Sequence, residues 1–113
     1  MTHRPENLLT VWADALLGAL AQAGVRDVVV SPGSRSTPFL LAAARRDDLT
    51  LHPVIDERAA SFYALGLARV TGAPPLLLCT SGTAPAHYFP AVIEASEAAL
   101  PLVVLSADRP TEL

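Results

Sequence analysis

The sequence is short of cysteine and of long apolar runs, and each shortage excludes a class of protein. A single cysteine, Cys79, among 113 residues rules out an internal disulfide and fits a reducing compartment. No apolar run reaches the ~18 residues that a membrane span needs. One segment resembles a signal-peptide core, but the polar residues Asp14 and Gln22 flank it closely. That segment also continues a helical pattern, which argues against a signal peptide. We therefore expect a cytoplasmic protein with no membrane partner.

Charged residues are also scarce. They make up 17% of the chain against 51% hydrophobic residues, and the formal net charge is −3. This composition excludes a disordered chain. Because there is no block of like charges and no basic stripe, we expect no nucleic-acid partner. A chain of this length holds at most one domain with a modest core.

Helical and strand patterns alternate along the chain. Apolar residues at three- and four-residue steps predict a first helix over residues 8–23. Apolar, β-branched runs bounded by turn residues predict short strands that are covered on both faces. The predicted strands are 25–30, 50–55, 76–80 and 102–105, and the later helices are 38–44 or 38–46 with Thr37 as N-cap, 59–70, and 85–99.

This alternation predicts an α/β fold with three layers, α/β/α, around a parallel sheet of four strands. No helix follows the fourth strand before the sequence stops at Leu113. We therefore expect residues 1–113 to be the first part of a longer protein, truncated within this domain.

The carboxyl ends of parallel strands meet at one edge of the sheet, which is where open α/β sheets bind ligands. The four predicted exit loops hold five of the seven serines, two glycine turns and the candidate ligand-binding charges. Glu57 stands where the second strand passes into a helix. Its charge either favours the positive end of that helix or takes part in chemistry. The loops are 31–36, 56–58, 81–83 and 106–109.

Three of these loops can be interpreted either as ligand-binding loops or as ordinary turns. Ser34 and Arg35 offer a hydroxyl and a guanidinium that suit a carboxylate or phosphate, or they form an ordinary turn with a solvated arginine. Residues 81–83 resemble a phosphate turn but lack the P-loop and dinucleotide glycine patterns. Arg109 either binds an anion or pairs locally with Asp108.

Histidine and cysteine do not form a metal-binding pattern. His3, His52 and His87 are scattered and lack metal-ligand spacing. Cys79 ends an apolar strand, so we expect it in the core. The sequence therefore predicts no metal site in this chain.

Four motifs occur in a fixed order: SPGSRSTP at 31–38, DER at 56–58, CTSGTA at 79–84 and ADRP at 107–110. Together they resemble the N-terminal, pyrimidine-binding domain of the MenD family of thiamine diphosphate enzymes, the 2-succinyl-5-enolpyruvyl-6-hydroxy-3-cyclohexene-1-carboxylate synthases. The resemblance runs from about Val25 to the last residue. The first and last motifs separate it from acetolactate synthase and pyruvate decarboxylase.

The resemblance implies a transferase of menaquinone biosynthesis. Such an enzyme decarboxylates 2-oxoglutarate and adds the succinyl unit to isochorismate, and thiamine diphosphate carries the difficult chemistry. The family binds the diphosphate with Mg²⁺ or Mn²⁺ through a later domain of the partner subunit in a homodimer or dimer of dimers. These 113 residues alone are then expected to be inactive.

The resemblance also implies residue roles. Glu57 matches the catalytic glutamate that holds N1′ of the aminopyrimidine and favours its imino tautomer. We expect Val54, Ile55, Ala60 and Leu65 to make its surroundings apolar, which suits a proton shared with a weakly basic nitrogen. The other matched residues are Ser81, Gly82 and Thr83 near the pyrimidine ring, and Ser34, Arg35 and Arg109 on the substrates' carboxylates.

One position departs from the family pattern: His87 stands where the family usually has asparagine. A histidine cannot supply both the donor and the acceptor geometry of an amide, so no role is carried over to it. Two alternatives remain open. The chain is either a non-catalytic α/β module that binds an anion, or a half-domain of another thiamine diphosphate enzyme such as acetolactate synthase.

Overall fold

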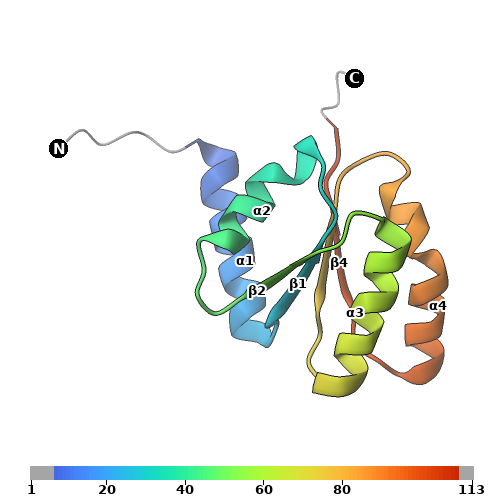
Figure 1. Cartoon of the computed structure of the whole chain (residues 1–113). Helices are drawn as coiled ribbons and strands as arrows, with labels where there is room; N and C mark the ends of the chain where they lie inside the picture. The colour runs from blue at the N-terminus through green and yellow to red at the C-terminus, as the bar shows by residue number, and fades with distance from the viewer. Residues whose placement is uncertain (1–6, 110–113) are drawn as a thin grey trace.

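The sheet consists of four parallel strands in the order β2-β1-β3-β4 (Figure 1). The computed structural model describes residues 7–109. Each strand has four residues; the central strands β1 and β3 are largely buried, and the outer strands β2 and β4 are partly exposed. Their bounds are β1 Asp27–Val30, β2 Thr50–Pro53, β3 Leu76–Cys79 and β4 Val103–Ser106.

Helices cover both faces of the sheet, which confirms the predicted three-layer α/β/α fold (Figure 1). Helices α1 and α2 lie on one face, and α3 and α4 lie on the other. Two 3₁₀ helices, η1 and η2, lead into α2 and α4. The bounds are α1 Leu8–Ala23, η1 Ser34–Ser36, α2 Thr37–Ala44, α3 Glu57–Thr71, η2 Ala84–Tyr88 and α4 Phe89–Ala98.

The two faces of the sheet carry separate apolar cores. Val28 of β1 and Leu78 of β3 pack against α1 and α2. Val29 and Leu77 point the other way, against α3 and η2. This alternation explains why β3 is apolar throughout and β1 is apolar after Asp27. Cys79 is fully buried in the second core, as predicted.

The order of the strands creates a switch point between β1 and β3. From β1 the chain passes through α2 to β2, and then returns over the opposite face through α3 to β3. The loops that leave β1 and β3 therefore diverge to opposite faces of the sheet. In open α/β sheets a ligand site forms outside the strand ends at such a point.

The predicted helix 85–99 divides into η2 and α4 because of Pro90. Proline has no backbone N–H and cannot continue the regular ladder. The preceding residue, Phe89, donates its N–H to Ala86 O in a 3₁₀ pattern. Helix α4 ends where Ala99 adopts left-handed φ of 56°.

Two helix starts also differ from prediction. Helix α3 begins at Glu57, two residues early, because the Asp56 carboxylate accepts the N–H of Ala59 at 2.8 Å and caps the helix. Thr37 is the first residue of α2 rather than its cap. Its hydroxyl donates back to Gly33 O at 3.4 Å, closing the η1 turn.

Candidate functional site at the carboxyl edge of the sheet

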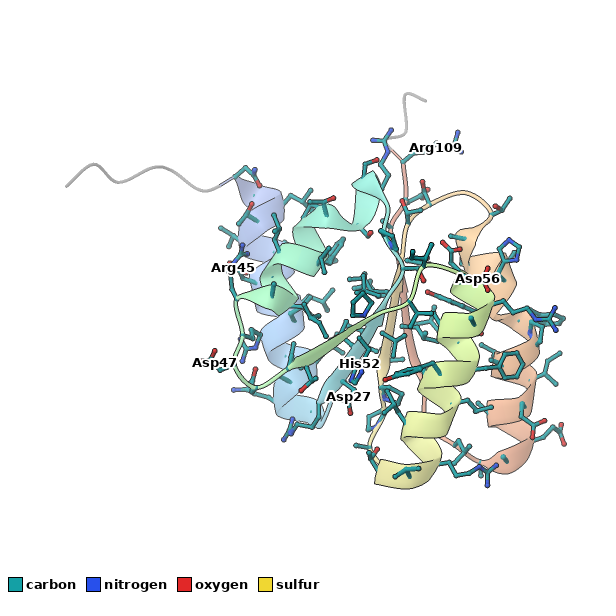
Figure 2. The ribbon with its side chains drawn as sticks, in the orientation of Figure 1. Asp27, Arg45, Asp47, His52, Asp56 and Arg109 are labelled. Atoms are coloured by element: carbon teal, nitrogen blue, oxygen red, sulfur yellow. The ribbon has the colours of Figure 1, made fainter. Side chains whose placement is uncertain are left out.

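The exit loops of the strands lie along one edge of the sheet. Figure 2 shows Arg109 beyond the end of β4, at the opposite end of the sheet from Asp27, which begins β1. Asp56 marks the start of α3, where the chain comes from β2. The parallel topology thus brings together the loops that the sequence singled out.

The β1 and β3 loops touch at Gly33 and Thr80. A Cβ atom added to Gly33 would lie 2.3 Å from the Thr80 Cβ atom, closer than any van der Waals contact allows. The backbone φ of Gly33 is 176°, so the close approach, and not its conformation, requires glycine there. This contact places Ser34 and Arg35 beside the β3 loop.

Ser31 fixes the β1 loop to the segment before Glu57. It is fully buried, and its hydroxyl donates to the Val54 carbonyl at 2.7 Å. Its backbone N–H donates to Leu78 O at 3.0 Å. Because all these groups are used inside the fold, Ser31 supports the site rather than binding a ligand.

Ser34 and Arg35 are both exposed on η1. The turn is closed instead by Ser36, which is buried and donates its hydroxyl to Gly33 O at 3.0 Å. Within the described residues, neither the Ser34 hydroxyl nor the Arg35 guanidinium has a hydrogen-bond partner. The geometry leaves both groups available to an anion at this edge.

Arg109 extends over the β3 turn. Its Nη2 atom lies 4.0 Å from where a Cβ of Gly82 would be. Gly82 has φ of 78°, a left-handed conformation that favours glycine. Asp108 accepts the backbone N–H of Arg109 at 2.8 Å, and over residues 7–109 no ion pair joins the two side chains. The predicted local pairing of the side chains is therefore not observed.

Glu57 is half-buried at the first position of α3. Asp56 performs the capping, so the Glu57 carboxylate has no hydrogen-bond partner among the described residues. It benefits from the positive end of the helix. This position satisfies the helix-end interpretation and leaves the carboxylate available for chemistry.

The surroundings of Glu57 are apolar on one side only. Ala60 and Leu65 are buried, as expected. Ile55 is 83% exposed and lines a separate apolar cavity of about 170 Å³ with Pro32 and Leu40. Ile55 is thus exposed in the single chain, and its expected part in the apolar surroundings of Glu57 stays a prediction.

Tyr88 is a residue that the sequence did not single out. It is 1% exposed, and its hydroxyl makes no regular hydrogen bond within residues 7–109; the Cys79 thiol lies close enough to act as a weak partner. Burial raises the pKa of its phenol far above the ordinary value, and the nearby Cys79 and the charge of Glu57 raise it further. No spacing rule distinguishes such an aromatic residue from ordinary core.

The Cys79 thiol lies in the same pocket as Tyr88. Burial raises the pKa of this thiol, the Tyr88 hydroxyl opposes that shift, and the charge of Glu57 adds to it. The Glu57 charge makes the smallest contribution to each shift, after burial and the mutual effect of the thiol and the phenol.

The remaining predicted positions are available at the surface. Ser81 is half-buried, and Gly82, Thr83 and His87 are exposed. Among residues 7–109 no group of three or more His, Cys, Asp or Glu side chains could hold a metal ion. In the same range no helix has the length and apolar content needed to cross a bilayer.

Comparison with known proteins agrees with these features. Residues 11–113 match the model described as "Thiamine pyrophosphate enzyme, N-terminal TPP binding domain". Similar curated proteins from Sorangium cellulosum and Halorubrum lacusprofundi are 57% and 60% identical over 107 residues, and one from Thermosynechococcus vestitus is 56% identical over 108 residues. All three are named 2-succinyl-5-enolpyruvyl-6-hydroxy-3-cyclohexene-1-carboxylate synthase.

These alignments cover 95–96% of this chain but only 17–19% of the relatives. The chain therefore spans less than a fifth of the length of the curated proteins that it matches. The resemblance expected from the four ordered motifs is confirmed.

Proposed function

Because the chain belongs to the thiamine pyrophosphate enzyme family and matches its N-terminal TPP-binding domain, we propose that it is the pyrimidine-binding part of a 2-succinyl-5-enolpyruvyl-6-hydroxy-3-cyclohexene-1-carboxylate synthase. The parent enzyme is a cytoplasmic transferase of menaquinone biosynthesis. It decarboxylates 2-oxoglutarate and adds the succinyl unit to isochorismate. Residues 1–113 are its incomplete first domain and are inactive alone.

The proposal includes a cofactor and a protein partner. Thiamine diphosphate supplies carbanion stabilisation when bound, and a later domain of a second, identical subunit holds its diphosphate with Mg²⁺ or Mn²⁺. The names of the relatives and the matched family support the cofactor. They do not favour a non-catalytic anion-binding module.

One observation carries the proposal: the half-buried carboxylate of Glu57 has no partner among the described residues and lies at the ligand-binding edge of the sheet. A carboxyl group there can share a proton with a weakly basic ring nitrogen, because the apolar side of its surroundings disfavours full charge separation. The residues present therefore fit an aminopyrimidine. In this role Glu57 holds the proton at its carboxyl oxygen, and the turn of residues 81–83 lies along the ring.

The substrates' carboxylates are assigned to Ser34, Arg35 and Arg109. Arg35 follows β1 and Arg109 follows β4, and β3 lies between those strands. The two guanidinium groups therefore approach the β3 turn from both sides. Arginine engages a carboxylate through two parallel N–H donors, which suits 2-oxoglutarate and isochorismate because each carries two carboxylates.

The test replaces Glu57 by glutamine in the complete enzyme. Glu57→Gln removes the shared proton but keeps the size of the side chain. We expect hydrogen–deuterium exchange at C2 of bound thiamine diphosphate, followed by NMR, to slow by roughly 10²–10⁴-fold.

The matched control is Glu94→Gln, an exposed position on α4, which should leave the exchange rate unchanged. Near-normal exchange in Glu57→Gln would reject the role of Glu57 and the proposed function with it.

A further inference from the structure

Within residues 7–109 the buried hydroxyl of Tyr88 makes no regular hydrogen bond, and the thiol of Cys79 is its one weak partner. Buried polar groups are nearly always hydrogen-bonded, so each exception calls for an explanation. The hydroxyl itself is buried away from water. Tyr88 belongs to an apolar cluster with Val29, Ala60, Ala64, Leu77, Cys79 and Ala84.

Glu57 offers the complementary group from the same face of α3. Ala60 and Ala64 pack in the cluster that holds Tyr88, and Glu57 precedes Ala60 by three residues. Residues at this spacing lie one turn apart on the same side of a helix. The carboxylate therefore lies above the tyrosine pocket, toward the edge of the sheet. It has no partner of its own among the described residues.

Electrostatics supports this proximity. The Glu57 charge contributes to the raised pKa of the Tyr88 phenol, after burial and the effect of Cys79. The phenol is protonated at neutral pH and can donate its hydrogen. A donor with only a weak partner and a carboxylate without a partner among the described residues thus belong to the same side of α3.

We propose that Tyr88 is a positioning residue that donates its hydroxyl hydrogen to the Glu57 carboxylate when the pyrimidine ring is bound. One carboxylate oxygen then meets the tyrosine, and the other faces the ring nitrogen. The inference rests on the proposed function and adds a residue to it. The motion falls to Glu57, which has three side-chain torsions, since packing fixes Tyr88.

Cys79 is the other polar group beside Tyr88. A thiol is a weak hydrogen-bond acceptor, whereas a bond to a carboxylate is charge-assisted and roughly twice as strong as a neutral one. Once the Glu57 side chain is in place, the carboxylate is therefore the preferred acceptor.

The test is Tyr88→Phe, measured in two ways. In the 113-residue chain without cofactor, the urea midpoint should stay unchanged or rise, because the variant loses no regular hydrogen bond. In the complete enzyme, the affinity for thiamine diphosphate, measured by calorimetry with Mg²⁺ present, should fall about tenfold. A residue that serves only the fold would move the first quantity and not the second.

The matched control is Tyr63→Phe, since Tyr63 is the only other tyrosine. Its hydroxyl lies 2.9 Å from His52 Nδ1. This variant loses a hydrogen bond away from the site. It should lower the urea midpoint and leave cofactor affinity unchanged, which is the opposite pattern to Tyr88→Phe.

A double variant tests the pairing directly. In a Glu57→Ala background, where no side-chain oxygen remains to accept the bond, Tyr88→Phe should weaken cofactor binding by less than twofold. Unchanged affinity in Tyr88→Phe alone would overturn the inference, and if Glu57→Gln still abolished C2 exchange, the proposed function would stand. A drop in urea midpoint as large as that of Tyr63→Phe would also overturn it, because the hydroxyl would then have a strong partner in the free chain.

Discussion

The carboxyl edge of the sheet and the rest of the surface treat charge differently. Away from that edge the structure forms three ion pairs, Arg45 with Asp14, Arg46 with Asp48, and His52 with Asp27, although other exposed charges there, such as Asp47, stay single within the described part of the chain. At the edge, within residues 7–109, Arg35, Glu57 and Arg109 have no ion pair. Figure 2 shows the contrast, with Arg109 beyond the strand ends and the Asp27–His52 pair near the other end of the sheet.

Among residues 7–109, unpaired charges of both signs lie together at the carboxyl edge, and this is the arrangement that a ligand-binding site requires. The paired charges are mostly solvent-exposed, and such pairs contribute little to stability, so their number is not what holds the fold. What matters is that the charged side chains at the carboxyl edge have no ion-pair partner among the described residues, although oppositely charged side chains are paired in other parts of the surface. Charged groups without protein partners are expected at functional sites, where they interact with a ligand.

The largest expected effect is at the contact that builds the edge. Gly33→Ala places a Cβ 2.3 Å from Thr80 Cβ, so the β1 and β3 loops must separate. We expect a loss of about 1–3 kcal/mol in the free energy of unfolding, measured by urea denaturation of the chain.

Gly66→Ala is the matched control for this prediction. Gly66 lies inside α3, and a Cβ there meets nothing within 4 Å. The change should stabilise the chain by roughly 0.5–1 kcal/mol, because alanine favours a helix over glycine. If Gly33→Ala left the urea midpoint unaltered, the β1 and β3 loops would not be in contact at Gly33. That contact would then not position the loops at the carboxyl edge.

The sequence predicted the fold well because each element carries its own local signal. The apolar periods of the first helix and the turn residues around each strand were sufficient to predict a parallel sheet with helices on both faces. Predicted helix boundaries were wrong by one or two residues where a residue outside the apolar repeat determined the end of the helix. Pro90 divided the last helix, and Asp56 capped α3 earlier than the apolar pattern began.

The candidate site was predictable in outline and not in detail. Parallel topology alone placed Glu57, Arg35 and Arg109 on one edge. The contact of Gly33 with Thr80 and the buried hydroxyl of Tyr88 depend on how distant segments pack. No spacing in the sequence records that packing. The exposure of Ile55 was missed for the same reason.

A medium effect is expected from the network that joins β1, β2 and α3. His52 Nε2 lies 2.8 Å from Asp27 Oδ1, and its Nδ1 lies 2.9 Å from the Tyr63 hydroxyl. His52→Leu leaves the partly buried Asp27 carboxylate without its partner and removes the exposed contact to Tyr63. We expect a loss of about 1–2 kcal/mol in the free energy of unfolding.

His87→Leu provides the comparison, since His87 is exposed and makes no hydrogen bond among the described residues. Its urea midpoint should match that of the parent chain. Equal losses in the two histidine variants would show that hydrophobic replacement, and not the network, lowers stability. The difference between the ion-paired side chains and the unpaired charges at the carboxyl edge would then be smaller.

The smallest effect is expected at Asp48, and its pH dependence makes it informative. Two hydrogen bonds of 2.9 Å from the Arg46 guanidinium hold the pKa of the Asp48 carboxyl below its usual range. A carboxyl whose pKa is lowered by folding stabilises the folded state above its unfolded pKa. That contribution is lost as the pH falls through the folded pKa. Asp48→Asn should therefore lower the urea midpoint slightly at pH 7 and not at all in strong acid.

Asp47→Asn is the control, because the neighbouring Asp47 is exposed and forms no ion pair among the described residues (Figure 2). It should show no difference at either pH, and 1 M salt should shrink the Asp48 effect because exposed charges are screened. A difference for Asp48→Asn that survived in strong acid could not come from the ion pair, since the carboxylate would be protonated. Asp48 would then act through packing, and the contrast with the open edge would rest on two matched pairs instead of three.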